Sequence, residues 1–221
     1  MRQQNEKVTG IVLKAEPIGE YDRRLVLLTG ERGKISAFAR GARRPHSPLL
    51  AATNPFCFGS FSIFFGRSAY SLSEAQISNF FAGFRDDYEA AYYGCYLLEL
   101  ADYYGHENND ERQLLNLLYQ SLKALCHPAY ERRLVRHVFE IKALVINGEY
   151  PGILPRADGK ATDWDDSTIF CLNHIVDSSI GKLFNFTLSA TQLAELGEIS
   201  AIYQSRFMDR PLKSLDILDK L

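Results

Sequence analysis

The sequence predicts an α+β protein, with a small β-barrel in the first part of its 221 residues and an α-helical domain after it. Up to about residue 80, apolar residues alternate with polar ones in short runs that end at turn residues, which is typical of β-strands. After that point the apolar residues recur at a spacing of about 3.6, which is typical of helices. A hydrophobic content of 46% supplies enough apolar side chains for buried cores.

Five short strands are expected in the first part of the chain. They are Val8–Lys14, Arg24–Thr29, Ile35–Arg40, Phe56–Phe65 and Ala69–Ile77. The glycines of Gly30-Glu31-Arg32-Gly33 permit a tight hairpin between the second and third strands, and Gly66-Arg67-Ser68 joins the last two. Five strands in about 75 residues match the size of an OB-type barrel, so we predict an OB fold for residues 1–80.

Four helices are expected in the second part. They run from Asp86 or Asp87 to near Gly105, from Asn109 or Asp110 to before Pro128, from Tyr130 to Ile146, and from Ser189 or Thr191 to about Phe207. Each start offers a capping side chain or follows a helix breaker, and the short links make the helices neighbours. Residues 81–150 together with 186–221 are therefore predicted to form the helical domain.

Residues 151–185 lose this periodicity and are predicted to form an irregular insert, with a β-like run at Thr168–Leu172. Cys171 and His174 stand there as CxxH, but a structural zinc site needs four ligands and only aspartates such as Asp163, Asp165 and Asp166 lie nearby. No bound metal and no cofactor are expected. A metal-dependent hydrolase that uses Cys171, His174 and the nearby aspartates stays an open alternative.

Charge is distributed unevenly along the chain. The net charge is -2, yet residues 1–80 carry 11 Lys+Arg against 6 Asp+Glu, which leaves the rest of the chain acidic. A basic module in an acidic protein is typical of nucleic-acid binding, because local potential attracts a polyanion. The four scattered cysteines and the lack of an apolar leader or of a membrane-length apolar run predict a cytoplasmic protein without membrane association.

No catalytic motif is present in the sequence. The stretch Gly30–Ile35 resembles a phosphate loop, but Leu28 replaces its first glycine and Ile35 its hydroxyl residue. HExxH and GxSxG patterns are absent, and the five histidines do not pair at metal-ligand spacing. The sequence therefore favours a protein that is not an enzyme.

The strongest local signal is a group of cations around the third strand. Lys34, Ser36, Phe38 and Arg40 share one face of a strand, so cations lie beside an aromatic ring. OB barrels hold single strands with this combination. The predicted DNA-binding residues are Lys34, Arg40, Arg43 and Arg44, with Arg23 and Arg24 widening the patch and Phe38 as a stacking platform. The alternative for Phe38 is a place in the core.

A second group of cations, Arg132, Arg133 and Arg136, lies on the third expected helix. Arg132 and Arg136 are four residues apart and share a face, and Arg136 is spaced to pair with Glu140. A basic rim on an apolar helix suits an acidic, hydrophobic peptide tail of a partner. The alternative is a solvated face tied by ion pairs.

The order of several motifs resembles the RecO family over about 200 residues. They are Thr9-Gly10-Ile11-Val12-Leu13, Gly33-Lys34, Ala39-Arg40-Gly41-Ala42-Arg43 with Ser47, Asn54-Pro55-Phe56, Arg132-Arg133-Leu134, Gly148 to Pro151, and Arg210-Pro211-Leu212-Lys213-Ser214. The resemblance implies an N-terminal OB fold, a helical domain and, in many members, a four-cysteine zinc finger. This sequence departs from the last feature, because only Cys171 remains in that region.

The resemblance also implies a function as a recombination mediator. Such proteins bind single- and double-stranded DNA, anneal complementary strands, bind the acidic tail of single-stranded-DNA-binding protein, and cooperate with RecR so that RecA replaces that protein on DNA. A nucleoid-associated place in the cytoplasm follows from this role. The competing interpretation is a protein-interaction adaptor that does not bind DNA directly.

Overall fold

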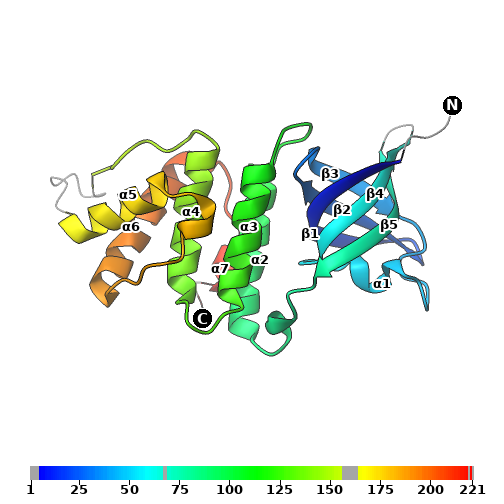
Figure 1. Ribbon diagram of the computed structural model, residues 1–221, viewed down its shortest axis with the longest axis horizontal. Helices are drawn as coiled ribbons and strands as arrows, with labels where there is room; N and C mark the ends of the chain where they lie inside the picture. Colours follow the sequence, from blue (N-terminus) through cyan, green and yellow to red (C-terminus); the bar gives the residue numbers. More distant parts are fainter. Residues whose placement is uncertain (1–4, 67–68, 156–163, 219, 221) are drawn as a thin grey trace. The chain divides into compact units, whose positions relative to one another are not determined.

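The computed structural model describes residues 5–66, 69–155, 164–218 and 220 (Figure 1). Its first part is a closed five-stranded barrel in the order β1-β2-β3-β5-β4. The strands are β1 (Glu6–Ile18), β2 (Asp22–Thr29), β3 (Gly33–Ala39), β4 (Phe58–Phe65) and β5 (Tyr70–Asn79). The predicted OB-like barrel is confirmed, while the turn expected at Arg67 and Ser68 lies outside the described residues.

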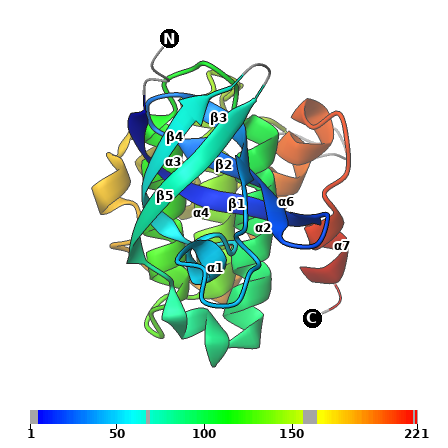
Figure 2. The same cartoon turned by 90° about the vertical axis from the view of Figure 1, so that its right-hand side faces the viewer.

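The barrel closes because its inward-facing side chains are small or apolar. Along β3 the residues Ile35, Ala37 and Ala39 are buried, and the residues between them are only half-buried. Leu25 and Phe61 of neighbouring strands are fully buried in the same cluster. Burying one such large apolar side chain stabilises a fold by about 1.5–3 kcal/mol. The short helix α1 (Leu49–Ala52) lies at one end of the barrel and adds Leu49 to this core (Figure 2).

The chain divides into two compact units, the first made of residues 1–86 with 101–119 and the second of 87–100 with 120–221. Strand β5 ends at Asn79, while the first unit continues to Asp86 and also includes residues 101–119, which the sequence had assigned to the helical domain. Backbone contacts hold them there, since Lys34 N–H donates to the His106 carbonyl at 2.9 Å. Gly33 is required at this point, because a Cβ would lie 2.1 Å from the His106 oxygen.

All four predicted helices are present. They are α2 (Tyr88–Tyr104), α3 (Arg112–Leu125), α4 (Arg132–Ile146) and α6 (Ala190–Phe207). Within the second unit, α4 packs against α6, and both helices carry fully buried residues such as Val138 and Leu196. Ser189 caps α6, because its side chain accepts the Gln192 N–H while the Gln192 side chain accepts the Ser189 N–H. Three short elements complete the chain: η1 (Ala82–Arg85), η2 (Ile180–Lys182) and α7 (Lys213–Leu218).

The prediction of an irregular insert at 151–185 is wrong for its second half, which contains helix α5 (Asp166–Asp177). Asp165 caps this helix by accepting the Ser167 N–H at 2.8 Å, and Thr168, Leu172 and Ile175 form its buried stripe. The β-branched residues that favoured a strand therefore lie on a helix whose apolar face packs on α4 and α6. Residues 156–163, the middle of the predicted insert, lie outside the described residues. Among the helices described, none has the length and apolar character needed to cross a membrane.

Candidate nucleic-acid interface

The outer surface of β2 and β3 carries the first group of predicted side chains. Arg24 of β2 lies opposite Phe38 of β3 in the strand register. Phe38 is half-buried on this outer surface and does not join the barrel core, so the alternative of a core residue is wrong. Arg24 is exposed, and its Nε–H donates to Ser36 Oγ at 3.0 Å. A guanidinium and an aromatic ring therefore share one face, as the alternation predicted.

The turn that follows β3 adds three exposed arginines: Arg40, Arg43 and Arg44. Two of them are held against the loop between β1 and β2. The Arg43 backbone N–H donates to the Tyr21 carbonyl at 2.8 Å, and its guanidinium donates to the Gly19 carbonyl at 3.3 Å. The Arg44 guanidinium lies 5.4 Å from the centre of the Tyr21 ring, which is within range of a cation–π contact.

We call the side chains of Tyr21, Arg24, Phe38, Arg40, Arg43 and Arg44 the basic face. Within the part of the chain that the structure describes, none of its four arginines forms an ion pair with a carboxylate. Among the described residues, these four exposed cations are therefore not neutralised by a carboxylate contact. Tyr21, with 39% of its surface exposed, is a member that the sequence did not predict. The signal that could have found it is its place in the turn between two strands.

Lys34 does not belong to the basic face, although it was predicted there. Its Nζ donates to the Asp102 carbonyl oxygen at 2.5 Å and lies 3.5 Å from the carboxylate. Lys14 binds the same carboxylate at 2.7 Å. Burial raises the pKa of Asp102, but the hydrogen bond from Lys14 and the charge of Lys34 outweigh that effect and leave the pKa lowered. The contacts of Lys34 therefore attach residues 101–119 to the barrel.

Arg23 is the second predicted residue that the structure places elsewhere. It is half-buried and points away from the face that carries Arg24, because successive strand residues alternate. Its Nη1 donates to the Leu50 carbonyl at 3.1 Å, to Thr53 Oγ1 at 2.7 Å and to Asn54 Oδ1 at 2.9 Å. The Arg23 side chain thus fixes the α1 segment at the end of the barrel.

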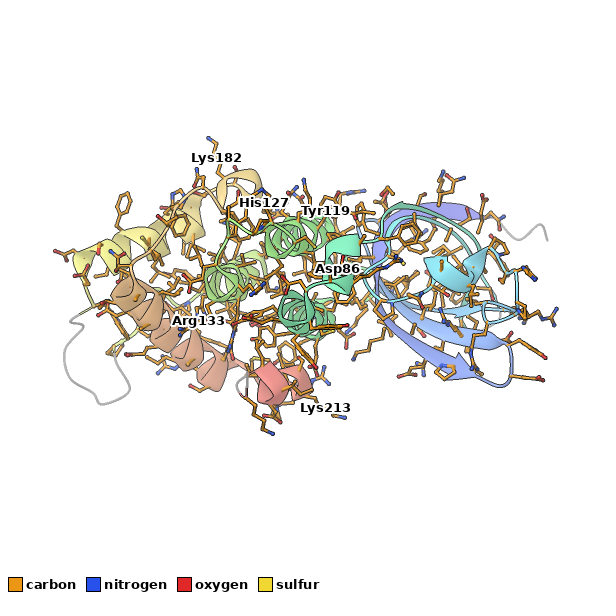
Figure 3. All side chains as sticks on the ribbon, turned by 90° about the horizontal axis from the view of Figure 1, so that it is seen from below. Asp86, Tyr119, His127, Arg133, Lys182 and Lys213 are labelled. Carbon is orange, nitrogen blue, oxygen red and sulfur yellow. The ribbon has the colours of Figure 1, made fainter. Side chains whose placement is uncertain are left out.

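The arginines of α4 are not gathered into one surface. Arg132 binds the carboxylates of Asp87 and Glu89, the latter at 2.7 Å. Arg136 binds Glu140 at 2.9 Å, as its spacing predicted. Arg133 is exposed and projects from α4 on the side away from Lys182 (Figure 3). The interpretation as a helix face tied by ion pairs therefore fits Arg132 and Arg136, and only Arg133 stays a candidate for contact with a partner.

A buried polar cluster surrounds Glu140 and was not predicted. Glu140 accepts hydrogen bonds from Tyr96 Oη and from Ser200 Oγ, both at 2.5 Å. His137 Nδ1 lies 2.8 Å from its second oxygen, and Arg136 completes the set. Burial raises the pKa of Glu140, but His137 and Arg136 lower it further than burial raises it, so the carboxylate stays ionised. Since both oxygens of the Glu140 carboxylate have hydrogen-bond partners, the cluster serves the stability of the helical unit.

Cys171 and His174 both lie on α5, and among the described residues they do not form a metal centre with other side chains. In the described ranges no group of three or more His, Cys, Asp or Glu side chains is arranged to hold a metal ion. The His174 ring packs edge-on against Phe186, and its Nδ1 lies 3.3 Å from Ser178 Oγ. Burial raises the pKa of the Cys171 thiol, which disfavours the thiolate that binds zinc. The donors present do not fit the zinc finger that the resemblance implies for many members.

Comparison with known proteins decides the family. Residues 1–81 match the family model described as "Recombination protein O N terminal", and residues 85–153 match "Recombination protein O C terminal". The chain belongs to the RecO family. RecO relatives resemble it over nearly all of its length, and they indicate a function in DNA repair and recombination. The family models end at residue 153, so α5, α6 and α7 lie beyond the matched part.

Three curated relatives, each named DNA repair protein RecO, show the range of similarity. The protein of Acetivibrio thermocellus is 29% identical over 97% of this chain and 96% of its own length. That of Alkaliphilus metalliredigens is 36% identical over 67% of this chain and 59% of its own. That of Bacillus subtilis is 27% identical over 97% of this chain and 94% of its own. The similarity therefore extends over both compact units.

Proposed function

We propose that this chain is a DNA-binding recombination mediator. In this role it binds single- and double-stranded DNA, anneals complementary strands and, together with RecR, helps RecA to replace single-stranded-DNA-binding protein. The observation that carries the proposal is the basic face, where Arg24, Arg40, Arg43 and Arg44 are exposed and unpaired with carboxylates among the described residues. Membership of a family of DNA repair proteins supports the same conclusion.

The basic face would act on DNA by charge and by stacking. Guanidinium groups neutralise backbone phosphates and displace condensed counterions, which contributes affinity without reading the sequence. The rings of Tyr21 and Phe38 lie among these cations, so bases that turn toward the barrel meet an aromatic surface. Two complementary strands repel each other, and cations that reduce this repulsion let them approach and pair. No bond-making step is needed from the protein.

Fewer residues are proposed for the partner contact than the sequence predicted. An acidic tail such as that of single-stranded-DNA-binding protein needs free cations beside apolar surface. Arg132 and Arg136 are already ion-paired within the helical unit, so this part of the proposal depends on Arg133. The contact with RecR is proposed from the family alone.

An annealing assay tests the proposed function. Complementary oligonucleotides coated with single-stranded-DNA-binding protein are mixed with the wild-type protein or with the Arg40→Ala plus Arg43→Ala variant. We expect faster annealing with the wild type and a clear loss with the variant, because two phosphate contacts are removed. The control is Arg85→Ala plus Lys182→Ala, which removes two other exposed cations that have no proposed binding role. Equal annealing by all three proteins, or no DNA binding by the wild type, would favour the adaptor interpretation.

A further inference from the structure

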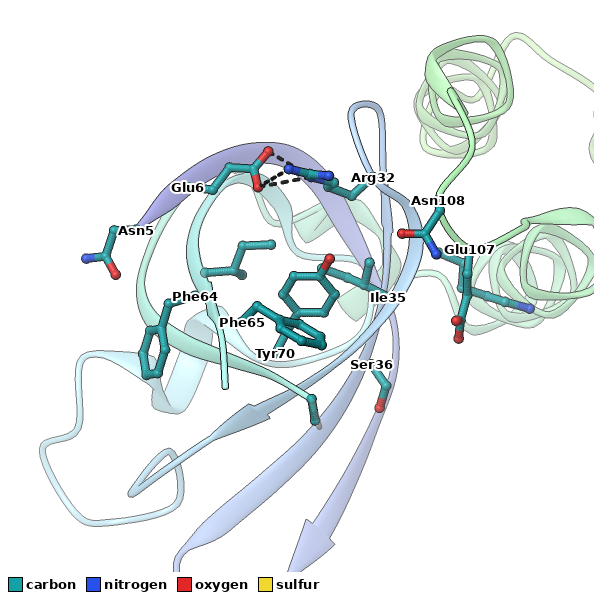
Figure 4. Close-up of a pocket in the computed structure, with 13 residues that line it drawn as sticks. Asn5, Glu6, Arg32, Ile35, Ser36, Phe64, Phe65, Tyr70, Glu107 and Asn108 are labelled. Carbon is teal, nitrogen blue, oxygen red and sulfur yellow. Dashed lines mark hydrogen bonds and ion pairs between the residues drawn. The ribbon is translucent and has the colours of Figure 1, made fainter. Parts of the chain in front are cut away.

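The barrel also has an open pocket of about 940 Å³, whose lining includes the core residues Ile35 and Ile63 (Figure 4). Its walls come from the start of β1, the first half of β3, the end of β4, Ala69 with the start of β5, and the segment with Glu107 and Asn108. Strands β3 and β5 pair at two described positions, Ala37 with Tyr70 and Phe38 with Ser71. The pocket lies beside the half of β3 that precedes these pairs, and we call it the barrel-mouth pocket.

Aromatic side chains give this pocket an apolar surface that solvent reaches. Phe65 is 59% exposed, and its ring centre lies 5.1 Å from that of Tyr70 with an interplanar angle of 70°. Figure 4 shows the two rings beside each other in the pocket, with Ile35 on the facing strand. Both rings present surface on which a flat group can stack.

The charges in the pocket do not favour a phosphate. The Arg32 guanidinium is paired with Glu6 through two hydrogen bonds of 2.9 and 3.0 Å (Figure 4). Lys34 is occupied by Asp102, and Glu107 adds a further carboxylate to the lining. Among the described lining residues there is thus no excess of free positive charge, in contrast to the basic face. A neutral, planar group with polar edges fits this combination of rings, amides and paired charges.

One side chain connects the pocket with the basic face. Ser36 lines the pocket, and its hydroxyl accepts the hydrogen bond from Arg24. A strand whose phosphate contacts Arg24 therefore has its base within reach of the barrel mouth. We infer that the barrel-mouth pocket receives an unstacked nucleobase of a single DNA strand whose phosphates lie on the basic face. This inference rests on the proposed function and adds to it a preference for single strands, because bases in a duplex stay stacked and paired.

Substitution of Phe65 tests the inference. Fluorescence polarisation measures the affinity of the wild type and of Phe65→Ala for labelled oligothymidylate, for the same strand with abasic sites, and for a duplex. We expect Phe65→Ala to weaken binding of oligothymidylate by about 5- to 150-fold, the range for loss of one stacked base. Abasic sites should weaken the wild type by a similar factor and the variant much less, since the two changes remove the same contact. Duplex affinity and the salt dependence should not change.

Two further variants make the result specific. Phe65→Trp keeps a stacking ring and should retain the affinity of the wild type, whereas Phe170→Ala removes another exposed ring, 73% exposed on α5, and should have no effect. Equal binding of oligothymidylate by the wild type and Phe65→Ala, or an equal loss on single strand and duplex, overturns the inference. If the wild type binds no DNA, the proposed function fails as well. If Arg40→Ala plus Arg43→Ala weakens DNA binding but Phe65→Ala does not, the proposed function stands and only the role of the barrel-mouth pocket is refuted.

Discussion

Removal of three arginines from the basic face should reduce the salt dependence of DNA binding by a calculable amount. The face has four exposed arginines without a carboxylate partner among the described residues. Each phosphate that a cation neutralises on a single strand contributes about -0.7 to the slope of log affinity against log salt. Four contacts therefore predict a slope of about -2.8 for the wild type, and Arg40→Ala plus Arg43→Ala plus Arg44→Ala should leave about -0.7. Lys34 and Arg23 are not counted among these phosphate contacts, because hydrogen bonds within the barrel unit already occupy both side chains.

These slopes translate into a large difference in affinity. Between about 50 and about 200 mM salt, the wild type should lose about 50-fold in affinity and the triple variant about 3-fold. Fluorescence polarisation with a labelled oligothymidylate measures both slopes. The matched control, Arg85→Ala plus Arg133→Ala plus Lys182→Ala, removes three exposed cations from other sites and should keep the slope of the wild type. A triple variant with the unchanged wild-type slope, or a wild type with a flat response, would refute the role of the basic face.

Three more predictions follow from residues that the structure places in other roles. Arg23→Met should lower the free energy of unfolding by about 1.5–3 kcal/mol in urea titration, because it removes hydrogen bonds to a charged group, while leaving the salt slope unchanged. The pKa of Glu140 is depressed in the folded state, so its contribution to stability is complete above its ordinary value of 4.5 and is lost as the pH falls toward the folded-state pKa. Urea midpoints of the wild type should therefore decrease in acid, and those of Glu140→Gln should decrease less; parallel curves would contradict this assignment. Arg133→Glu should weaken binding of an acidic, apolar tail peptide in a polarisation assay, and equal affinity would remove the helical unit from the partner proposal.

The sequence predicted the barrel because short β-rich runs end at turn residues, and on β3 the alternation is regular enough for its inward face to be read directly. Ile35, Ala37 and Ala39 are small or apolar at every second position, and they are buried. Arg40, Arg43 and Arg44 were predictable as a group because a short turn keeps neighbours in sequence close in space. Local pattern was sufficient wherever the structure depends on residues a few positions apart.

Long-range packing was not predictable in this way. Alternation places Lys34 on the outer face of β3, but it does not tell which segment covers that face, and Asp102 is 68 residues away in the chain. The same holds for Arg23, whose partners Thr53 and Asn54 follow it by 30 and 31 residues. Helix α5 was not predicted, for a different reason. Its β-branched residues by themselves favour a strand, but in the fold the apolar stripe of the helix packs against α4 and α6 and stabilises the helical conformation.

Photo-crosslinking to a single strand tests the central claim most directly, because it locates bound DNA without changing the protein. Oligothymidylate containing 4-thiothymidine is crosslinked to the wild-type protein, and the modified peptides are identified by mass spectrometry. We expect crosslinks in the peptides that contain Tyr21 and Phe38, with further crosslinks at Phe65 if a base enters the barrel-mouth pocket. Crosslinks confined to residues 120–221, with none in the barrel, would contradict it.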